Sequence, residues 1–231
     1  MKRIIILLLI SLSFVFNIDC QTLFAQTATD AMLSDKHDGE VDEDGIQWIS
    51  MSDPQYEWDQ VDDKKIKIEL TEEGMKFNCK DESLTALSTI ELPIDEERDN
   101  FTFGFKFKGI KLDDKRFVGL VFNYEDNQNY QGFGLYKKQC SYFKVKDGKL
   151  STIKTGLIKY KNNSFTLLMT RNTKGVSFKF NDLDDICHLK SIKIDSPYFG
   201  IFMSGKSSMT VSAFTFSVER HDDSEASTSD M

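Results

Sequence analysis

Alternation of apolar and polar residues with a period of two is the feature that most constrains how this chain folds. In "FTFGFKF" every second residue from Phe101 to Phe107 is a phenylalanine, and "KIKIEL" and "SFTLLMT" alternate in the same way. Successive side chains of a β-strand point to opposite faces, so this period predicts strands with one buried face. Turn residues between the runs favour antiparallel pairing. We expect about a dozen strands and little helix.

The last of these runs changes its buried face part of the way along. Its apolar residues fall at Met209 and Val211 and then at Phe214 and Phe216. One inserted residue near Ala213 would produce this change, which predicts a β-bulge. Many short strands in one chain are typical of a two-sheet sandwich or a barrel.

The two ends of the chain differ from the middle. Residues 1–25 combine Lys2 and Arg3 with an apolar run and a small Ala25, which is the pattern of a signal peptide. Residues 26–45 and 221–231 are polar and rich in acids, so we expect a disordered leader and a disordered tail. The sequence therefore predicts one domain over residues 46–220, in a protein that is secreted or periplasmic.

The charge balance limits the partners. The chain carries 29 Lys and Arg against 37 Asp and Glu, and has no basic block. Nucleic acids and anionic membranes bind clustered cations, so neither is an expected partner. Membrane contact would require an uncleaved N-terminal segment or lipidation of Cys20, and the residues before Cys20 lack the small side chain that lipidation usually needs.

Three further cysteines, Cys79, Cys140 and Cys187, allow at most one disulfide and one free thiol after removal of residues 1–25. No spacing indicates zinc, and each cysteine stands beside a predicted strand. We interpret them as small buried residues, with their pairing open.

Several stretches together resemble the concanavalin A-like lectin/glucanase superfamily, nearest to the secreted bacterial group that includes 3-keto-disaccharide hydrolase domains. They are "FTFGFKFKGI", "RFVGLVFNYEDNQNYQGFGL", "YFKVKDGKL", "NNSFTLLMTRNTKGVSFKFND", "YFGIFMSG" and "VSAFTFSV". The resemblance implies an all-β fold, a jelly-roll sandwich of two antiparallel sheets. The last strand of that group often carries an Asp-Asn pair where this chain reads Phe214-Thr215, so a site that needs the pair is not expected.

The sequence has no recognisable catalytic motif. The Glu-x-Asp-x-x-Glu run of glucanases is missing, and the nearest stretch places Pro93 between Glu91 and Asp95. His188 stands apart from other metal-ligating residues, while His37 and His221 fall in the two ends. There is no serine elbow and no phosphate-binding loop. We expect no catalytic residue and no metal.

Aromatic and amide side chains point instead to sugar binding, because a flat ring stacks on a sugar and amides bond its hydroxyls. Packing is the alternative role for each of them. The predicted function is non-catalytic binding of carbohydrate or cell-envelope glycan, and the alternatives are a glycoside hydrolase-like enzyme and a protein–protein interaction module. The candidate residues are Trp48, Trp58, Arg116, Asn123, Tyr124, Asn129, Tyr130 and Tyr136.

The stretch "GLVFNYEDNQNYQGFGL" predicts a hairpin. If "EDNQN" is a five-residue loop, Tyr124 faces Tyr130, and Gly132 faces Phe122 to make room for its ring. A calcium site is the alternative for this loop, with Glu125, Asp126, Asn127 and Asn129 as its ligands, although the spacing matches no known calcium loop.

Overall fold

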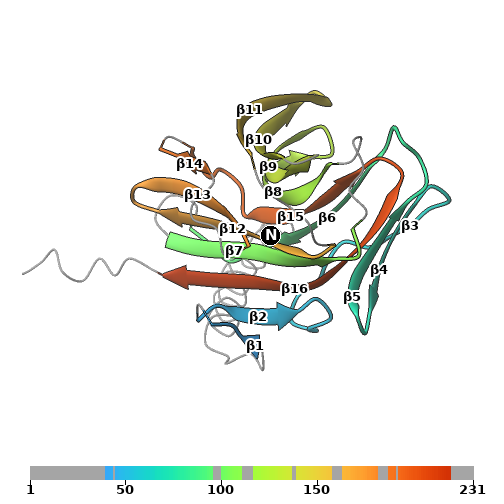
Figure 1. The fold of residues 1–231 in the computed structure, drawn as a ribbon, viewed down its shortest axis with the longest axis horizontal. Helices are drawn as coiled ribbons and strands as arrows, with labels where there is room; N and C mark the ends of the chain where they lie inside the picture. The colour runs from blue at the N-terminus through green and yellow to red at the C-terminus, as the bar shows by residue number, and fades with distance from the viewer. Residues whose placement is uncertain are drawn as a thin grey trace, which may run out of the picture. The chain divides into compact units, whose positions relative to one another are not determined.

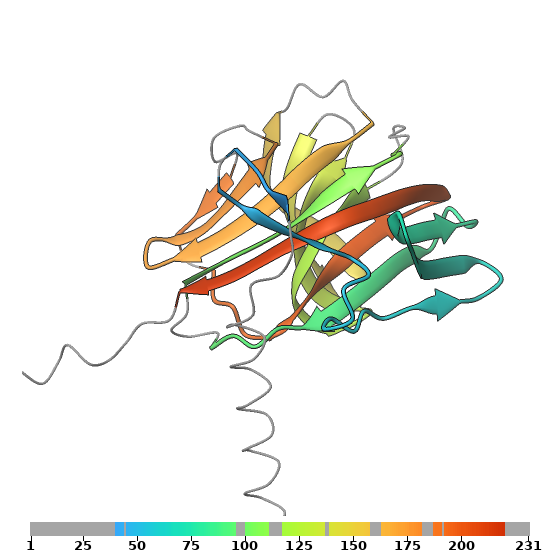
Figure 2. The ribbon, with the colours of Figure 1, turned by 90° about the horizontal axis from the view of Figure 1, so that it is seen from below.

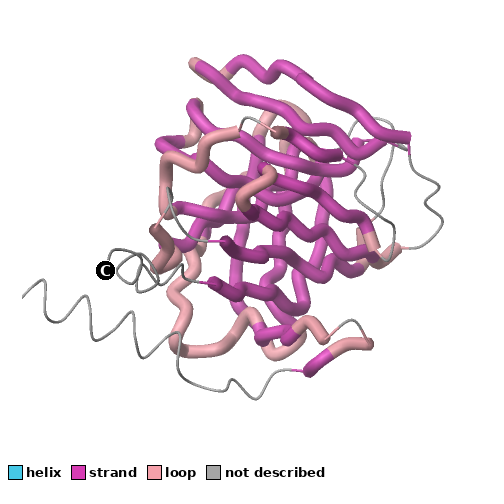
Figure 3. The backbone as a smooth tube through the Cα atoms, turned by 90° about the vertical axis from the view of Figure 1, so that its left-hand side faces the viewer, coloured by secondary structure: helices cyan, strands magenta, loops and turns pink. Residues whose placement is uncertain are grey.

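The computed structural model describes residues 40–43, 45–95, 100–110, 117–136, 139–157, 163–181, 187–190 and 192–219. All of these belong to one compact unit, Asp38–Met231. The predicted signal peptide and the predicted tail lie outside the described residues. The regular secondary structure of the described ranges consists of β-strands (Figure 3). No helix in these ranges is long and apolar enough to span a membrane.

The strands form two antiparallel sheets (Figure 1). The six-stranded sheet has the order β11-β10-β9-β8-β15-β6. Its strands are β6 (Thr85–Glu91), β8 (Phe117–Asp126), β9 (Asn129–Tyr136), β10 (Gln139–Lys146), β11 (Lys149–Leu157) and β15 (Tyr198–Ser204).

The ten-stranded sheet has the order β14-β13-β12-β7-β16-β5-β4-β3, with β2 also pairing with β16 and β1 with β2. Several of its strands have only two or three residues, which is why the described part of the chain has more strands than the dozen expected. Its strands are β1 (Glu40–Val41), β2 (Gln47–Ser50), β3 (Val61–Asp62), β4 (Ile66–Thr71), β5 (Gly74–Cys79), β7 (Asn100–Lys108), β12 (Phe165–Asn172), β13 (Gly175–Phe180), β14 (Cys187–Leu189) and β16 (Ser207–Glu219).

Aromatic rings from the two sheets meet in the core. The rings of Phe101 and Phe199 lie 5.4 Å apart, and those of Phe133 and Phe178 lie 4.4 Å apart. Each pair joins one strand of the ten-stranded sheet to one of the six-stranded sheet. The phenylalanines at every second position of β7 are all buried, as the alternation predicted. The fold is the two-sheet antiparallel sandwich expected from the sequence.

The predicted bulge in the last strand is confirmed. The register of β16 with β7 shifts between Val211 and Ala213, where Ser212 is the inserted residue. Before the bulge Val211 pairs with β5, and after it Phe214 pairs with β2. Figure 2 shows β16 as the long red strand, with β4 and β5 (teal) beside its beginning. Strand β16 thus pairs with two strands along one edge, with β5 before the bulge and with β2 after it.

The ordered domain begins earlier than the expected start at residue 46. Strand β1 pairs with β2 through Glu40 and Trp48. The Asp42 carboxylate accepts a hydrogen bond of 2.7 Å from Trp48 Nε1 and one of 2.9 Å from Ile46 N. The end of the acidic segment expected to be disordered is therefore part of the fold. The hydrogen bonds of Asp42 hold this segment in place, and a prediction based on the burial of apolar surface does not include such bonds.

Candidate functional site

The β8–β9 hairpin differs from the five-residue loop expected. Asp126 pairs with Asn129, so the turn itself is only Asn127-Gln128. A bulge between Phe122 and Asp126 then shifts the register. The observed pairs are Phe122 with Gln131, Val121 with Gly132, Leu120 with Phe133, and Gly119 with Gly134. The expected pairing of Phe122 with Gly132 is wrong by one residue, because the prediction had no bulge.

The shifted register changes what the glycines do. Gly132 now lies on the face of Val121, opposite to the face of Phe122, whose ring contacts Phe178 across the sandwich at 5.7 Å. A Cβ atom on Gly132 would collide with the ring of Phe143, and one on Gly134 would lie 3.0 Å from the rings of Phe117 and Phe202. The glycines therefore make room for rings on the outer face of the six-stranded sheet.

These rings belong to a second apolar cluster, which we call the outer aromatic cluster. The rings of Phe117, Phe143 and Phe202 pack at centroid distances between 4.7 and 5.0 Å. Three predicted tyrosines join it: Tyr130 is 7% exposed, while Tyr124 and Tyr136 are half-buried at its margin. The full set is Phe117, Val121, Tyr130, Phe143, Val145 and Phe202, with Leu87, Tyr124 and Tyr136 packed against it.

A polar cavity of about 260 Å³, which we call the hairpin pocket, adjoins this cluster and shares Tyr130 and Val145 with it. Its walls come from β8, β9, β10 and the segment before β15. They are lined by Asn123, Glu125, Asn129, Tyr130, Gln131, Lys144, Val145, Lys146, Asp195 and Ser196.

Two predicted residues build the walls of the hairpin pocket. Asn123 has φ 48°, and its Nδ2 donates to Lys193 O at 2.7 Å while its Oδ1 accepts from Asp195 N at 2.8 Å. Asn129 Nδ2 donates to both carboxylate oxygens of Asp126, and its Oδ1 accepts from Asp147 N at 3.2 Å. Asn123 thus holds the segment before β15, and Asn129 ties two hairpin turns together. Both side-chain amides are occupied by these bonds.

The groups left for a ligand are charged. Among the described residues, the side chains of Glu125, Lys144 and Lys146 have no hydrogen bond or ion pair. Gln131 Oε1 accepts from Tyr142 OH at 2.8 Å, and its NH₂ group remains a donor. The hairpin pocket therefore offers the carboxylate of Glu125 and several N–H donors, while its second carboxylate, Asp195, is paired with Lys193.

The tyrosine hydroxyls remain protonated donors at neutral pH. Burial raises the pKa of Tyr130 to about 12, and the nearby Tyr124 adds to the shift. Burial also raises the pKa of Tyr124, with a smaller contribution from the carboxylates of Asp59 and Asp126. Tyr124 OH forms a hydrogen bond of 3.0 Å with Asn127 Oδ1, so this ring is fixed against the turn.

The tryptophans lie elsewhere. The Trp48 ring lies 4.6 Å from Lys106 Nζ at the ten-stranded sheet, and Trp58 is in the core against Phe105 and Phe214. Neither lines the hairpin pocket. Arg116, also predicted, lies outside the described residues.

Sequence reasoning missed part of the hairpin pocket. Gln131, Lys144, Lys146, Asp195 and Ser196 line it but were not predicted. Only the true register places Lys144 opposite Gln131, and the segment with Asp195 comes from far along the chain. No local pattern marks these residues.

In the loop proposed as a calcium site, the carboxylate of Asp126 accepts hydrogen bonds from within the turn. Asp126 Oδ1 accepts from Gln128 N at 2.6 Å and from Asn129 Nδ2 at 3.1 Å, which closes the turn and lowers the pKa of Asp126. In the described ranges no three His, Cys, Asp or Glu side chains gather as a metal site would need. The calcium alternative has no support from this geometry.

No protein-family model and no curated protein sequence matches this chain. Solved structures of other proteins do match it. It is similar to the carbohydrate-binding module CBM66 from Bacillus subtilis, with a TM-score of 0.52 and 16% identity over 69% of this chain and 94% of that one. It is also similar to a protein of unknown function with a galectin-like fold from Bacillus subtilis, with a TM-score of 0.50 and 8% identity over 74% and 94%.

A third similar structure is the K247S mutant of the GH43 protein BlXynB from Bacillus licheniformis, with a TM-score of 0.51 and 13% identity over 70% of this chain. The match spans only 37% of that protein. At these identities the likeness concerns the fold alone. It agrees with the lectin-like sandwich that the sequence resemblance implied.

Proposed function

We propose that this protein binds carbohydrate at the hairpin pocket and the outer aromatic cluster beside it, without catalysis. The observation that carries the proposal is that a polar cavity adjoins the cluster in which three tyrosines gather, and shares Tyr130 and Val145 with it. A similar fold occurs in CBM66, which is named as a carbohydrate-binding module. Fold similarity alone is a weak argument for function, so the site carries the greater weight.

The chemistry of the site suits a sugar. The half-buried rings of Tyr124 and Tyr136 lie at the margin of the cluster, where a ring face can stack on a sugar. Glu125, Gln131 and the two lysines of the pocket supply donors and acceptors for sugar hydroxyls. The Asn123 and Asn129 bonds hold the main-chain segments around the pocket, which lowers the ordering cost of binding.

A cell-envelope glycan is the ligand we propose, because residues 1–25 have the pattern of a signal peptide. A secreted or periplasmic bacterial location is part of this proposal. Expression of the full chain in a bacterium, followed by cell fractionation and N-terminal sequencing, tests it. A protein kept in the cytoplasm with residues 1–25 intact would contradict it.

Native affinity electrophoresis against envelope glycans and plant polysaccharides tests the binding site. We expect retardation of the wild type and a loss of about tenfold in affinity for Lys144→Met/Lys146→Met, since each lost charged hydrogen bond costs about 1 kcal/mol or more. Lys179→Met, at an exposed position of β13, is the matched control. If no glycan slows the wild type, the proposal is wrong.

The interaction-module alternative has one observation in its favour. Leu150 and Ile153 are 52% and 56% exposed on β11, at the edge of the six-stranded sheet. Exposed apolar residues on an edge strand favour pairing with another chain. Light scattering of the wild type and of Leu150→Lys/Ile153→Lys would reveal such an assembly.

The hydrolase alternative rests on the resemblance to the group with 3-keto-disaccharide hydrolase domains. The carboxylate tested for it is that of Glu91, which is exposed on the outer face of the six-stranded sheet and whose Oε2 accepts a hydrogen bond of 3.1 Å from Tyr198 OH. Release of reducing sugar by the wild type but not by Glu91→Gln would favour this alternative.

A further inference from the structure

Five polar side chains lie in one line across the ten-stranded sheet. Direct cross-strand pairs join His188 to Ser177 and Ser177 to Thr170. Further pairs join Thr170 to Thr102 and Thr102 to Ser217. The strands β14, β13, β12, β7 and β16 are consecutive in the sheet. We call this line the polar row.

The polar row faces away from the core. Directly paired residues share a face of the sheet, and strand neighbours of the row, such as Phe103 and Phe178, point into the sandwich. Adjacent strands lie about 4.8 Å apart, so the row spans roughly 19 Å. Ser177 is buried (7% exposed), so the part of the row that is open to a ligand runs from Thr170 to Ser217 and spans roughly 10 Å.

The hydroxyls of the row hold each other in place. Ser177 Oγ and His188 Nδ1 are 2.9 Å apart, and Thr102 Oγ1 and Thr170 Oγ1 are 3.4 Å apart. A hydroxyl both donates and accepts, so those of Thr102, Thr170 and Ser217 retain capacity for a ligand hydroxyl, whereas Ser177 is buried. Because short β-strand side chains have few rotamers, little entropy is lost when a ligand binds them.

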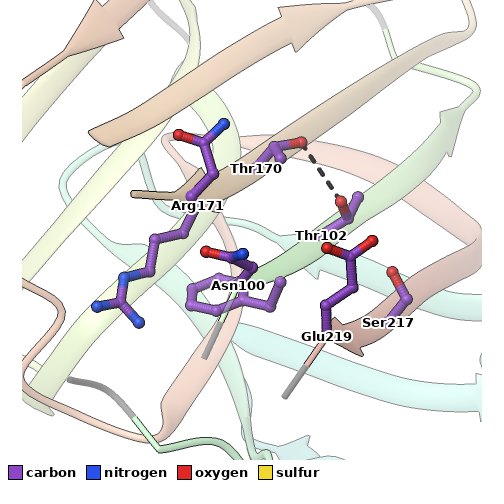
Figure 4. A pocket seen from close by; sticks show the side chains of 8 residues that line it. Asn100, Thr102, Thr170, Arg171, Ser217 and Glu219 are labelled. Carbon is purple, nitrogen blue, oxygen red and sulfur yellow. Dashed lines mark hydrogen bonds between the residues drawn. The ribbon is translucent and has the colours of Figure 1, made fainter. Parts of the chain in front are cut away.

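Three residues of the row, Thr170, Thr102 and Ser217, line a cavity of about 180 Å³, the sheet pocket. Figure 4 shows Asn100 between Arg171 on one side and Glu219 on the other, with the bonded pair Thr102 and Thr170 adjacent. The pocket holds one carboxylate and one guanidinium, and its other polar groups are neutral. Its lining is Asn100, Phe101, Thr102, Thr170, Arg171, Asn172, Ser217 and Glu219.

We propose that the polar row and the sheet pocket form a second binding site, which holds an extended neutral polysaccharide running across the strands. This inference rests on the proposed carbohydrate binding but places it on the other sheet. The balanced charge of the pocket favours a neutral ligand over a polyanion. The row of hydroxyls matches a ligand that carries hydroxyls at regular intervals, and the sheet pocket receives its end.

Two sites on opposite sheets have a consequence for binding strength. A soluble polysaccharide with many repeats can occupy both sites of one molecule or join two molecules. Such linkage raises the apparent affinity well above that of either site. Short oligosaccharides that reach only one site lack this gain.

The experiment measures binding of neutral polysaccharides (xylan, laminarin, mannan and levan) by native affinity electrophoresis, and of their oligosaccharides with one to six units by calorimetry. The test variant is Thr102→Val/Thr170→Val, which removes both partners of one hydrogen bond and leaves neither unsatisfied. The matched control is Thr166→Val, on the same face of β12 but outside the row. Urea unfolding verifies that all variants remain folded.

We expect the dissociation constant of a hexasaccharide to rise about tenfold in Thr102→Val/Thr170→Val, and to stay unchanged in Thr166→Val. We also expect the wild type to bind a hexasaccharide more tightly than a monosaccharide. The variant Lys144→Met/Lys146→Met, in the hairpin pocket, should leave this binding in place.

Three results would overturn the second site. The first is a Thr102→Val/Thr170→Val protein that binds as the wild type does, while the hairpin-pocket variant loses all binding. The second is equal affinity for a monosaccharide and a hexasaccharide. The third is an equal loss in the Thr166→Val control. A wild type that binds no glycan of either panel would instead reject the proposed function itself.

Discussion

Asn123 Nδ2 donates a hydrogen bond of 2.7 Å to the main-chain oxygen of Lys193, which joins the bulge of β8 to the segment before β15. The same side chain is 6% exposed and its residue has φ 48°. A left-handed backbone and a bridging amide are thus combined in one residue. Asparagine suits both needs, because it tolerates this backbone better than most residues.

Two replacements of Asn123 separate the contribution of its left-handed backbone from that of its side-chain hydrogen bonds. Asn123→Ala should lower the free energy of unfolding by about 2–4 kcal/mol, from backbone strain and lost hydrogen bonds together. Asn123→Gly keeps the backbone relaxed and should lose about 1–2 kcal/mol less. Urea unfolding measures both. Asp147→Gly, at an exposed turn residue with φ 50°, is the control and should be nearly neutral. Equal losses in Ala and Gly would contradict this account.

Gly132 should be intolerant of alanine, because the added Cβ meets the ring of Phe143 and the carbonyl oxygen of Leu120. We expect a loss of about 1–3 kcal/mol from overpacking. Gly148→Ala adds a Cβ in open space and should lose only the cost of its φ of 72°, about 1 kcal/mol. Partial recovery in Gly132→Ala/Phe143→Leu, seen in thermal unfolding, would identify the ring as the obstacle; no recovery would assign the loss to the backbone contact alone.

Two tyrosines should titrate late. Burial raises the pKa of both Tyr56 and Tyr130 to about 12, above the value near 10 of an unfolded chain. The folded state then holds protons that the unfolded state loses, so their stabilising contribution is complete below about pH 10 and falls as pH rises towards 12. Tyrosinate absorbance against pH should show one late-titrating group fewer in Tyr130→Phe and in Tyr56→Phe. Normal titration of all tyrosines in the folded wild type would contradict the burial.

The strand cysteines should resist thiol reagents. Cys79, Cys140 and Cys187 are buried as reduced thiols, and burial, with Cys187 nearby, raises the pKa of Cys140. Since the thiolate is the reactive form, we expect no labelling of these three at pH 8 in the folded protein and complete labelling in urea. Mass spectrometry of tryptic peptides identifies each site. Rapid labelling of Cys140 in the folded state would be the contrary outcome.

The sequence predicted the layers of this fold because alternation is a local signal. The phenylalanines of β7 are buried as expected, and the change of face near Ala213 corresponds to a bulge. The predicted register of the β8–β9 hairpin was wrong for a different local reason. Its register depends on the left-handed backbone of Asn123, and that conformation leaves no mark in the hydrophobic pattern.

The candidate site was predicted in part. Tyr124, Tyr130 and Tyr136 were selected as aromatic residues on strands, and all three gather at the outer aromatic cluster. Tyr130 and Tyr136 share the parity of β9, whereas Tyr124 lies within the bulged part of β8. Lys144 and Asp195 were not selected, because their place in the hairpin pocket depends on strand order and on a distant segment. Trp48 and Trp58 were selected for their chemistry, and both are buried away from the hairpin pocket.

The bulge at Ser212 gives deletions a special effect in this protein. Odd-numbered residues of β16 face the core before it, and even-numbered residues face the core after it. Loss of that single codon would place Val211 and Phe214 two positions apart, which is regular alternation, so Phe214 would still face the core and Ser217 would still face outward. The strand can therefore be shortened by one residue at Ser212 with both halves on their present faces, and Ser217 at the end of the polar row would keep its outward direction.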